Sequence, residues 1–149
     1  MKRTRKKKSF WTRHSLTIIA VSILLIWFFL YVDNDPDSHM GAFFGNAIAD
    51  WSGVVMTIVA TKYFYEIGSK ESKKPKIQYK NRLFESMHEH SLSIFLIVTG
   101  IGWCVIYWGY VDDTQGKWGT VISNMLSEWT QQLGLVLLTK KLIEAGSKE

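Results

Sequence analysis

The chain has 149 residues, 47% of them hydrophobic, a formal net charge of +5 and seven tryptophans. Its single cysteine, Cys104, excludes an intrachain disulfide. This composition is compatible with one compact soluble domain or with a small membrane protein, and the distribution of apolar and charged residues separates the two.

The first predicted elements are a basic segment, residues 1–13, and the apolar run Leu16 to Val32 behind it. The run has 17 residues without a charge, and about 17–25 residues suffice to cross a bilayer core. A secretory signal would have a similar basic leader, but no small-x-small cleavage site follows this run. We therefore predict a membrane span. Its basic leader is expected to lie in the cytoplasm and to contact anionic lipid, with no role in nucleic-acid binding.

Residues 41–65 come next and are long enough to span a membrane, but polar residues interrupt them. Leu92 to Val111 is an uninterrupted apolar run of 20 residues and predicts a second clear span. The last segment, residues 118–143, is again long but polar in its middle. Hydropathy alone therefore leaves the second and fourth segments ambiguous.

Charge resolves the ambiguity. Of the 18 Lys and Arg residues, all but Lys117 lie before the first run, between Lys62 and Arg82, or at the C-terminal end. The connections near Asp33 and Asp112 are acidic. By the positive-inside rule this pattern predicts four spans in a cell membrane (inner or plasma membrane), with both termini in the cytoplasm.

The two halves of the chain also repeat each other. His14-Ser15-Leu16 recurs as His90-Ser91-Leu92. The polar residues that recur 78 positions later are Asn46, Asp50, Trp51, Thr61, Lys62, Glu66 and Gly68–Glu71, repeated as Asn124, Glu128, Trp129, Thr139, Lys140, Glu144 and Gly146–Glu149. We predict an all-α integral membrane protein whose four transmembrane helices form two parallel helical-hairpin repeats, residues 14–71 and 90–149.

A cytoplasmic linker, residues 72–89, is expected between the hairpins. Pro75 interrupts it, and residues 77–87 are predicted to form a short amphipathic helix on the membrane surface. The sequence His88-Glu89-His90 offers two imidazoles and a carboxylate, but its spacing is generic and we predict no metal site and no cofactor.

Each repeat places a carboxylate inside its second span, Asp50 and Glu128, where burial in hydrocarbon costs about 2.5–3.5 kcal/mol. An asparagine precedes each acid by four residues, on the same helix face. The polar stripe continues through Gly53, Thr57 and Thr61 in the first repeat and Gln131, Leu135 and Thr139 in the second. Because lipid satisfies no polar group, the stripe is expected to face protein or water.

Two interpretations of the stripe remain open. It could line a water-filled path or cation site in an oligomeric cation or proton channel or transporter, with Asp50, Glu128, Asn46, Asn124 and Gln131 as its polar groups. It could instead bind helices together, with Trp51 and Trp129 donating indole N–H groups.

The alternatives at the level of function are a membrane scaffold or regulatory subunit that docks a partner membrane protein, and a signal-triggered membrane-disrupting effector. No Gly-rich phosphate loop or nucleophile-and-base set is present in the sequence, so we do not expect an enzyme. Lys62 and Glu66, four residues apart, are expected to pair along one helix, as are Lys140 and Glu144.

Overall fold

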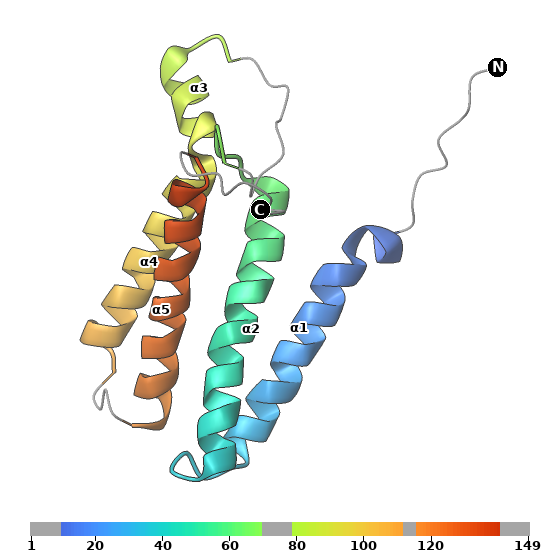
Figure 1. Cartoon of the computed structure of the whole chain (residues 1–149), viewed down its shortest axis with the longest axis vertical. Helices are drawn as coiled ribbons and strands as arrows, with labels where there is room; N and C mark the ends of the chain where they lie inside the picture. Colours follow the sequence, from blue (N-terminus) through green and yellow to red (C-terminus); the bar gives the residue numbers. More distant parts are fainter. Residues whose placement is uncertain (1–9, 70–78, 112–115, 141–149) are drawn as a thin grey trace, which may run out of the picture.

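The computed structural model describes residues 10–69, 79–111 and 116–140, and within these ranges it is all-helical, with no strand (Figure 1). The helices are α1 (Phe10–Val32), α2 (His39–Tyr63), α3 (Arg82–Glu89), α4 (Ser91–Gly109) and α5 (Lys117–Leu138).

Two antiparallel hairpins, α1–α2 and α4–α5, lie side by side, and α2 and α5 form most of the contact between them (Figure 1). A first core cluster, Met56, Ala60, Leu92, Leu96, Trp129 and Val136, joins α2, α4 and α5. A second cluster, Tyr31, Phe44, Ile48 and Val121, joins α1, α2 and α5. Helix α2 therefore belongs to both clusters, and its buried face consists largely of small residues that allow close helix packing.

The turn from α1 to α2 is tight, and its sequence explains why. The Ser38 hydroxyl accepts a hydrogen bond from the Gly41 N–H at 3.0 Å and caps the start of α2. A Cβ at Gly41 would lie 1.9 Å from the Asp35 carbonyl oxygen, so only glycine fits there. The α1–α2 hairpin thus depends on a serine cap and a close backbone approach.

Lys117, the exception to the charge segregation, joins the hairpins at the end where α1 stops. Its ammonium group donates to the carbonyls of Val32 (3.1 Å) and Asn34 (2.8 Å), near the end of α1, where the helix leaves its last carbonyls unpaired. The Tyr31 hydroxyl in turn donates to the Lys117 carbonyl. This position therefore has a structural reason to carry a lysine.

In the part of the chain that the structure describes, three helices are long and apolar enough to cross a membrane: α1 from His14 to Val32, α2 and α4. Their outward faces carry large exposed apolar side chains, such as Ile19 and Val98. The chain thus has the features of a helical membrane protein. Helix α5, predicted from charge and repetition to be a fourth span, is more polar and is not among these apolar helices.

Several predicted boundaries change. Helix α1 begins at Phe10, inside the predicted basic segment, whose residues 1–9 lie outside the described part. The linker helix begins at Arg82, because Asn81 caps it by accepting from the Leu83 N–H at 2.9 Å. Residues 79–81 are not helical, so the predicted helix over 77–87 starts too early.

Candidate functional site

The contact between α2 and α5 pairs an asparagine with its own counterpart. The Asn124 side-chain amide donates to the side-chain oxygen Oδ1 of Asn46 at 2.6 Å. The two residues are 78 positions apart and are related by the sequence repetition.

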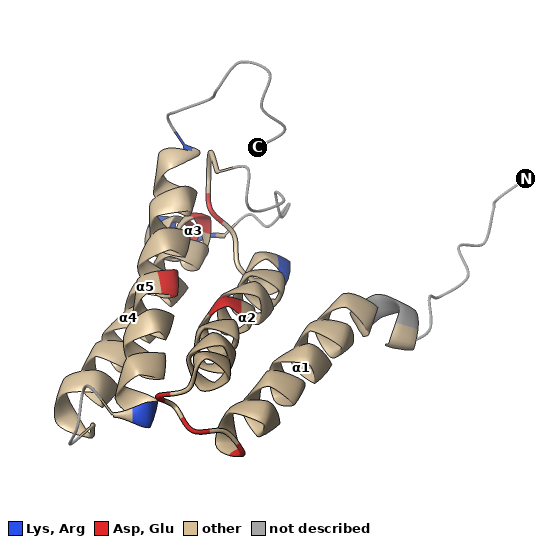
Figure 2. Ribbon diagram, turned by 60° about the horizontal axis from the view of Figure 1, so that its bottom comes forward, with Lys and Arg blue, Asp and Glu red and all other residues tan. Residues whose placement is uncertain are grey.

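One helical turn further along α2 and α5, Asp50 and Glu128 border the same cavity. A cavity of about 180 Å³ is lined by Asn46, Asp50, Asn124, Ser127 and Glu128. Figure 2 shows the acidic positions of α2 and α5 along these neighbouring helices. The structure thus brings four of the predicted site residues together and adds Ser127, which a three-residue step from Asn124 could have indicated.

Gly53 provides room for the longer of the two acids. A Cβ added there would lie 3.1 Å from a carboxylate oxygen of Glu128, so the Glu128 side chain extends across the glycine. Asp50 and Asn46 are exposed, whereas Glu128 and Asn124 are half-buried. The site is therefore a groove open on one side, with carboxylates from both hairpins.

A second, larger cavity of about 450 Å³ lies at the end where α1 turns into α2. Its lining includes Tyr31, Asp37, Lys117 and Asn46. Asn46 lines both cavities and is the residue that their linings share.

Toward the opposite end the stripe becomes narrow. Thr57 and Thr61 donate to the carbonyls of Gly53 (2.9 Å) and Thr57 (2.6 Å) on their own helix. A space of only about 10 Å³ lies beside them, lined also by Gln132. Gln131, the residue singled out in the sequence, is exposed and lines none of these three cavities. Gln132, four residues after Glu128, instead lies on the face of α5 that borders the small space beside the threonines.

The two tryptophans differ. The buried Trp129 donates its indole N–H to the Thr99 hydroxyl at 2.8 Å, which joins α5 to α4. Trp51 on α2 is half-buried. Trp129 thus makes the type of interhelical bond expected of both, but within its own hairpin.

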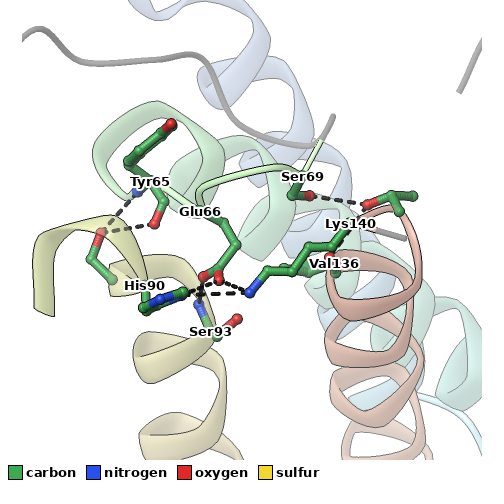
Figure 3. Close-up of polar contacts among 9 residues, drawn as sticks. Tyr65, Glu66, Ser69, His90, Ser93, Val136 and Lys140 are labelled. Carbon is green, nitrogen blue, oxygen red and sulfur yellow. Dashed lines mark hydrogen bonds and ion pairs between the residues drawn. The ribbon is translucent and has the colours of Figure 1, made fainter. Parts of the chain in front are cut away.

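A polar cluster that the sequence did not indicate lies at the other end of the molecule (Figure 3). Helix α2 ends at Tyr63, so Glu66 is not on a helix with Lys62, and it crosses to the other hairpin. There the fully buried Glu66 accepts from His90 Nδ1 (2.8 Å), from the Ser93 N–H (3.0 Å) and from the Lys140 ammonium. The expected pairing of Glu66 along its own helix is thus replaced by pairing across the hairpins. The other expected pair, Lys140 with Glu144, involves Glu144, which lies outside the described residues.

The cluster keeps Glu66 ionised. Burial alone would raise the pKa of this carboxyl, but the hydrogen bonds from Lys140, His90 and Ser93 together outweigh burial and lower the pKa below its ordinary value.

The histidines of the sequence His88-Glu89-His90 point to different partners. The His88 ring packs against Tyr65 and Tyr79, whereas His90 contacts Glu66. Within the described ranges no group of three His, Cys, Asp or Glu side chains is placed to hold a metal ion.

Taken together, fold and site define a helical protein with membrane-spanning character and a carboxylate-lined groove between two hairpins. The sequence matches no protein-family model, and neither a curated protein nor a solved structure is significantly similar to it.

Proposed function

We propose that the protein is a small four-span membrane protein, built from two parallel hairpin repeats, that conducts or transports a cation or proton along the groove between α2 and α5. Asp50 and Glu128 are its charged groups, and Asn46 and Asn124 position them. The observation that carries this proposal is that acids from separate hairpins line one cavity, which shares Asn46 with a larger cavity at the end of the bundle.

The four-span topology is supported by the length and direction of α5. At 22 residues, α5 is about 33 Å long, enough for a bilayer core, and it runs beside α4 and α2 (Figure 1). Trp129 and Val136 of α5 pack inward with α2 and α4. Its exposed polar residues, such as Gln131, would need water or protein beside them within a membrane.

The exposure of Asp50 supports an oligomer. An exposed carboxylate in the middle of a spanning helix is costly against hydrocarbon, so it requires water or protein next to it. A homo-oligomer that closes the open side of the groove would supply both, and it would convert the groove into an enclosed path.

The narrow threonine end of the stripe favours a second candidate. There the hydroxyls are satisfied by their own helix and the remaining space is about 10 Å³, too small for a path in this conformation. A scaffold or regulatory subunit that uses the groove to dock a partner's helix would need no opening at that end.

The test is flux of K⁺, Na⁺ and H⁺ into proteoliposomes that contain the purified protein. The matched variant is Asp50→Asn/Glu128→Gln, which keeps side-chain shape and hydrogen bonding while removing charge. We expect the wild type to carry one of these ions and the variant to lose at least about tenfold of that flux while still assembling. If the folded wild type carries none of them, the transport proposal is wrong and the scaffold function is favoured.

A further inference from the structure

A lysine and a histidine of the second hairpin share one anionic oxygen. Oε1 of Glu66 lies 2.8 Å from His90 Nδ1 and also pairs with the Lys140 ammonium (Figure 3). The His90 and Lys140 nitrogens themselves lie 3.5 Å apart. Two nitrogens at this separation, one of them on a cation, can therefore donate to the same negatively charged oxygen.

The first hairpin carries the same two residue types at the repeated positions, His14 and Lys62, which we call the basic pair. Lys62 Nζ lies 2.8 Å from His14 Nδ1. Lys62 is exposed and His14 is half-buried. Among the described residues, no carboxylate forms an ion pair with either side chain. The basic pair thus has the donors that hold Glu66 on the second hairpin, and in this part of the chain no carboxylate uses them.

The basic pair lies where both helices of the first hairpin reach the end of their apolar length. The apolar span of α1 begins at His14, and α2 ends at Tyr63, one residue after Lys62. Side chains at the ends of spanning helices lie at the depth of the lipid headgroups, where long basic side chains reach the phosphates. This depth favours a phosphate as the anion that the basic pair binds.

Aromatic side chains flank the basic pair. The Phe10 and His14 rings lie 4.6 Å apart, and Lys62 Nζ lies 5.5 Å from the centre of the Tyr63 ring. Phe10, Trp11 and Tyr63 are 65%, 70% and 64% exposed. Exposed aromatic rings are typical of the boundary between hydrocarbon and headgroups. The surroundings therefore suit a ligand that joins an anionic oxygen to an apolar part, as a phospholipid does and a free phosphate does not.

We propose that the basic pair binds the phosphate group of an anionic phospholipid, with the Lys62 ammonium and the His14 Nδ1–H donating to its oxygens. His14 then donates from the same ring nitrogen as His90 does to Glu66. Binding requires a proton on His14 Nδ1, so the bond between Lys62 and this nitrogen is exchanged for two bonds to phosphate oxygens. The site rests on α1 and α2 crossing the membrane, as in the proposed function, but not on transport or on a spanning α5.

Native mass spectrometry of the purified protein in a mild detergent tests the proposal, because it counts bound lipids. The protein is titrated with anionic phosphatidylglycerol and, separately, with zwitterionic phosphatidylcholine. Lys62→Gln removes the charge, Lys62→Arg keeps a cationic donor, and His14→Phe keeps a ring beside Phe10 but removes the N–H. The matched control is Lys80→Gln, which removes one positive charge from the exposed segment before α3 and leaves the basic pair intact.

We expect the wild type to bind phosphatidylglycerol more tightly than phosphatidylcholine. Lys62→Gln should weaken the binding of phosphatidylglycerol at least about tenfold and His14→Phe about threefold, whereas Lys62→Arg and Lys80→Gln should stay within about twofold of the wild type. Unchanged binding in Lys62→Gln, or equal weakening by Lys62→Gln and Lys80→Gln, would overturn the proposal. Inorganic phosphate in large excess should not displace the lipid, and displacement would overturn the assignment to a phospholipid.

A phosphatidylglycerol with a photoreactive headgroup gives a second readout in proteoliposomes. We expect cross-links to the wild type near His14 and Lys62, which excess phosphatidylglycerol removes and phosphatidylcholine does not. Cross-links at other basic residues alone would contradict the site. The melting temperature of each variant in detergent shows whether it is folded, and the cross-link positions in the wild type decide the question if a variant is not. Neither readout measures flux, so a failure of the transport proposal leaves this test intact.

Discussion

Glu66 shows how a single residue can link two distant parts of the chain. It is fully buried, and a buried charge is stable only when it is paired and hydrogen-bonded. Lys140 provides the opposite charge, His90 donates a second hydrogen bond to the same carboxylate oxygen, and the Ser93 N–H satisfies the other oxygen. Removing one partner of such a pair typically costs about 3–5 kcal/mol. Because Lys140 is about one-fifth exposed, we place the loss for Lys140→Met near the lower end, about 3 kcal/mol.

The pH dependence of this cluster follows from the lowered pKa of Glu66. A carboxyl whose pKa is lower in the folded state contributes stability above its unfolded pKa, about 4.3. That contribution is lost as the pH falls through the folded pKa. We expect melting in detergent between pH 6 and pH 3 to show a smaller fall in stability for Glu66→Gln than for the wild type. Glu85→Gln, on α3 away from the cluster, is the control, and equal acid sensitivity of Glu66→Gln and wild type would contradict the assignment.

The polar pairs at the groove could be predicted only in part. Four-residue spacing puts Asn46 and Asp50 on one helix face, and likewise Asn124 and Glu128. All four residues line one cavity in the structure. It did not show that the two asparagines would bond to each other, because that depends on how α2 rotates against α5. The same rotation also decides that Gln132, and not Gln131, lies beside the threonines of α2.

At the scale of elements, the turns and helix ends decide what the hairpins can contact. Helix α2 stops at Tyr63, and the residues that follow it, including Glu66 and Ser69, extend to the other hairpin. The sequence has no proline or glycine at this point, so helical periodicity alone predicted a longer helix and a pairing of Lys62 with Glu66. Backbone bonds from Leu92 N to Tyr65 O (3.0 Å) and from Ile67 N to Glu89 O (2.7 Å) compensate for the lost helical turn.

The start of α2 gives an element-scale prediction. Gly41→Ala would force a methyl group into the backbone of the α1–α2 turn, where no flexible side chain can move aside. We expect a loss of at least about 2 kcal/mol in the free energy of unfolding, since strain at a close backbone contact is a recognised cause of large effects.

The matched control for this change is Gly102→Ala on α4, where nothing lies within 4 Å of the added methyl group. It should be neutral or slightly stabilising, because alanine favours a helix over glycine. Unfolding of both variants by increasing SDS in mixed micelles is the measurement. Equal stability of the two variants would mean that the turn has room that the structure does not show.

At the scale of the whole molecule, the number of spans decides where the C-terminal end lies. Four spans place residue 147 on the same side as the connection between the hairpins, whereas three spans place it on the opposite side. The charge distribution and the path of α5 beside α4 both favour four.

Cysteine labelling of intact cells, in a Cys104→Ser background, measures this directly. We expect a membrane-impermeant maleimide to label Asp35→Cys from outside, and to label Tyr79→Cys and Ser147→Cys only after permeabilisation. Asp35 and Tyr79 serve as the outer and inner reference positions. Labelling of Ser147→Cys in intact cells would show that α5 does not cross, and it would withdraw the four-span topology.

The sequence by itself determined the helical class, the three apolar helices α1, α2 and α4, and the separation of acidic from basic connections, because each of these depends on composition and spacing along one helix. Only the tertiary structure decided that Asn46 bonds to Asn124, that Tyr31 is buried between helices, and that Glu66 pairs with residues of the second hairpin. The physical reason is that spacing fixes which residues share a helix face. Which faces meet, and where the chain leaves a helix to cross between hairpins, depends on side-chain packing and on the pairing of buried charges between residues far apart in the sequence.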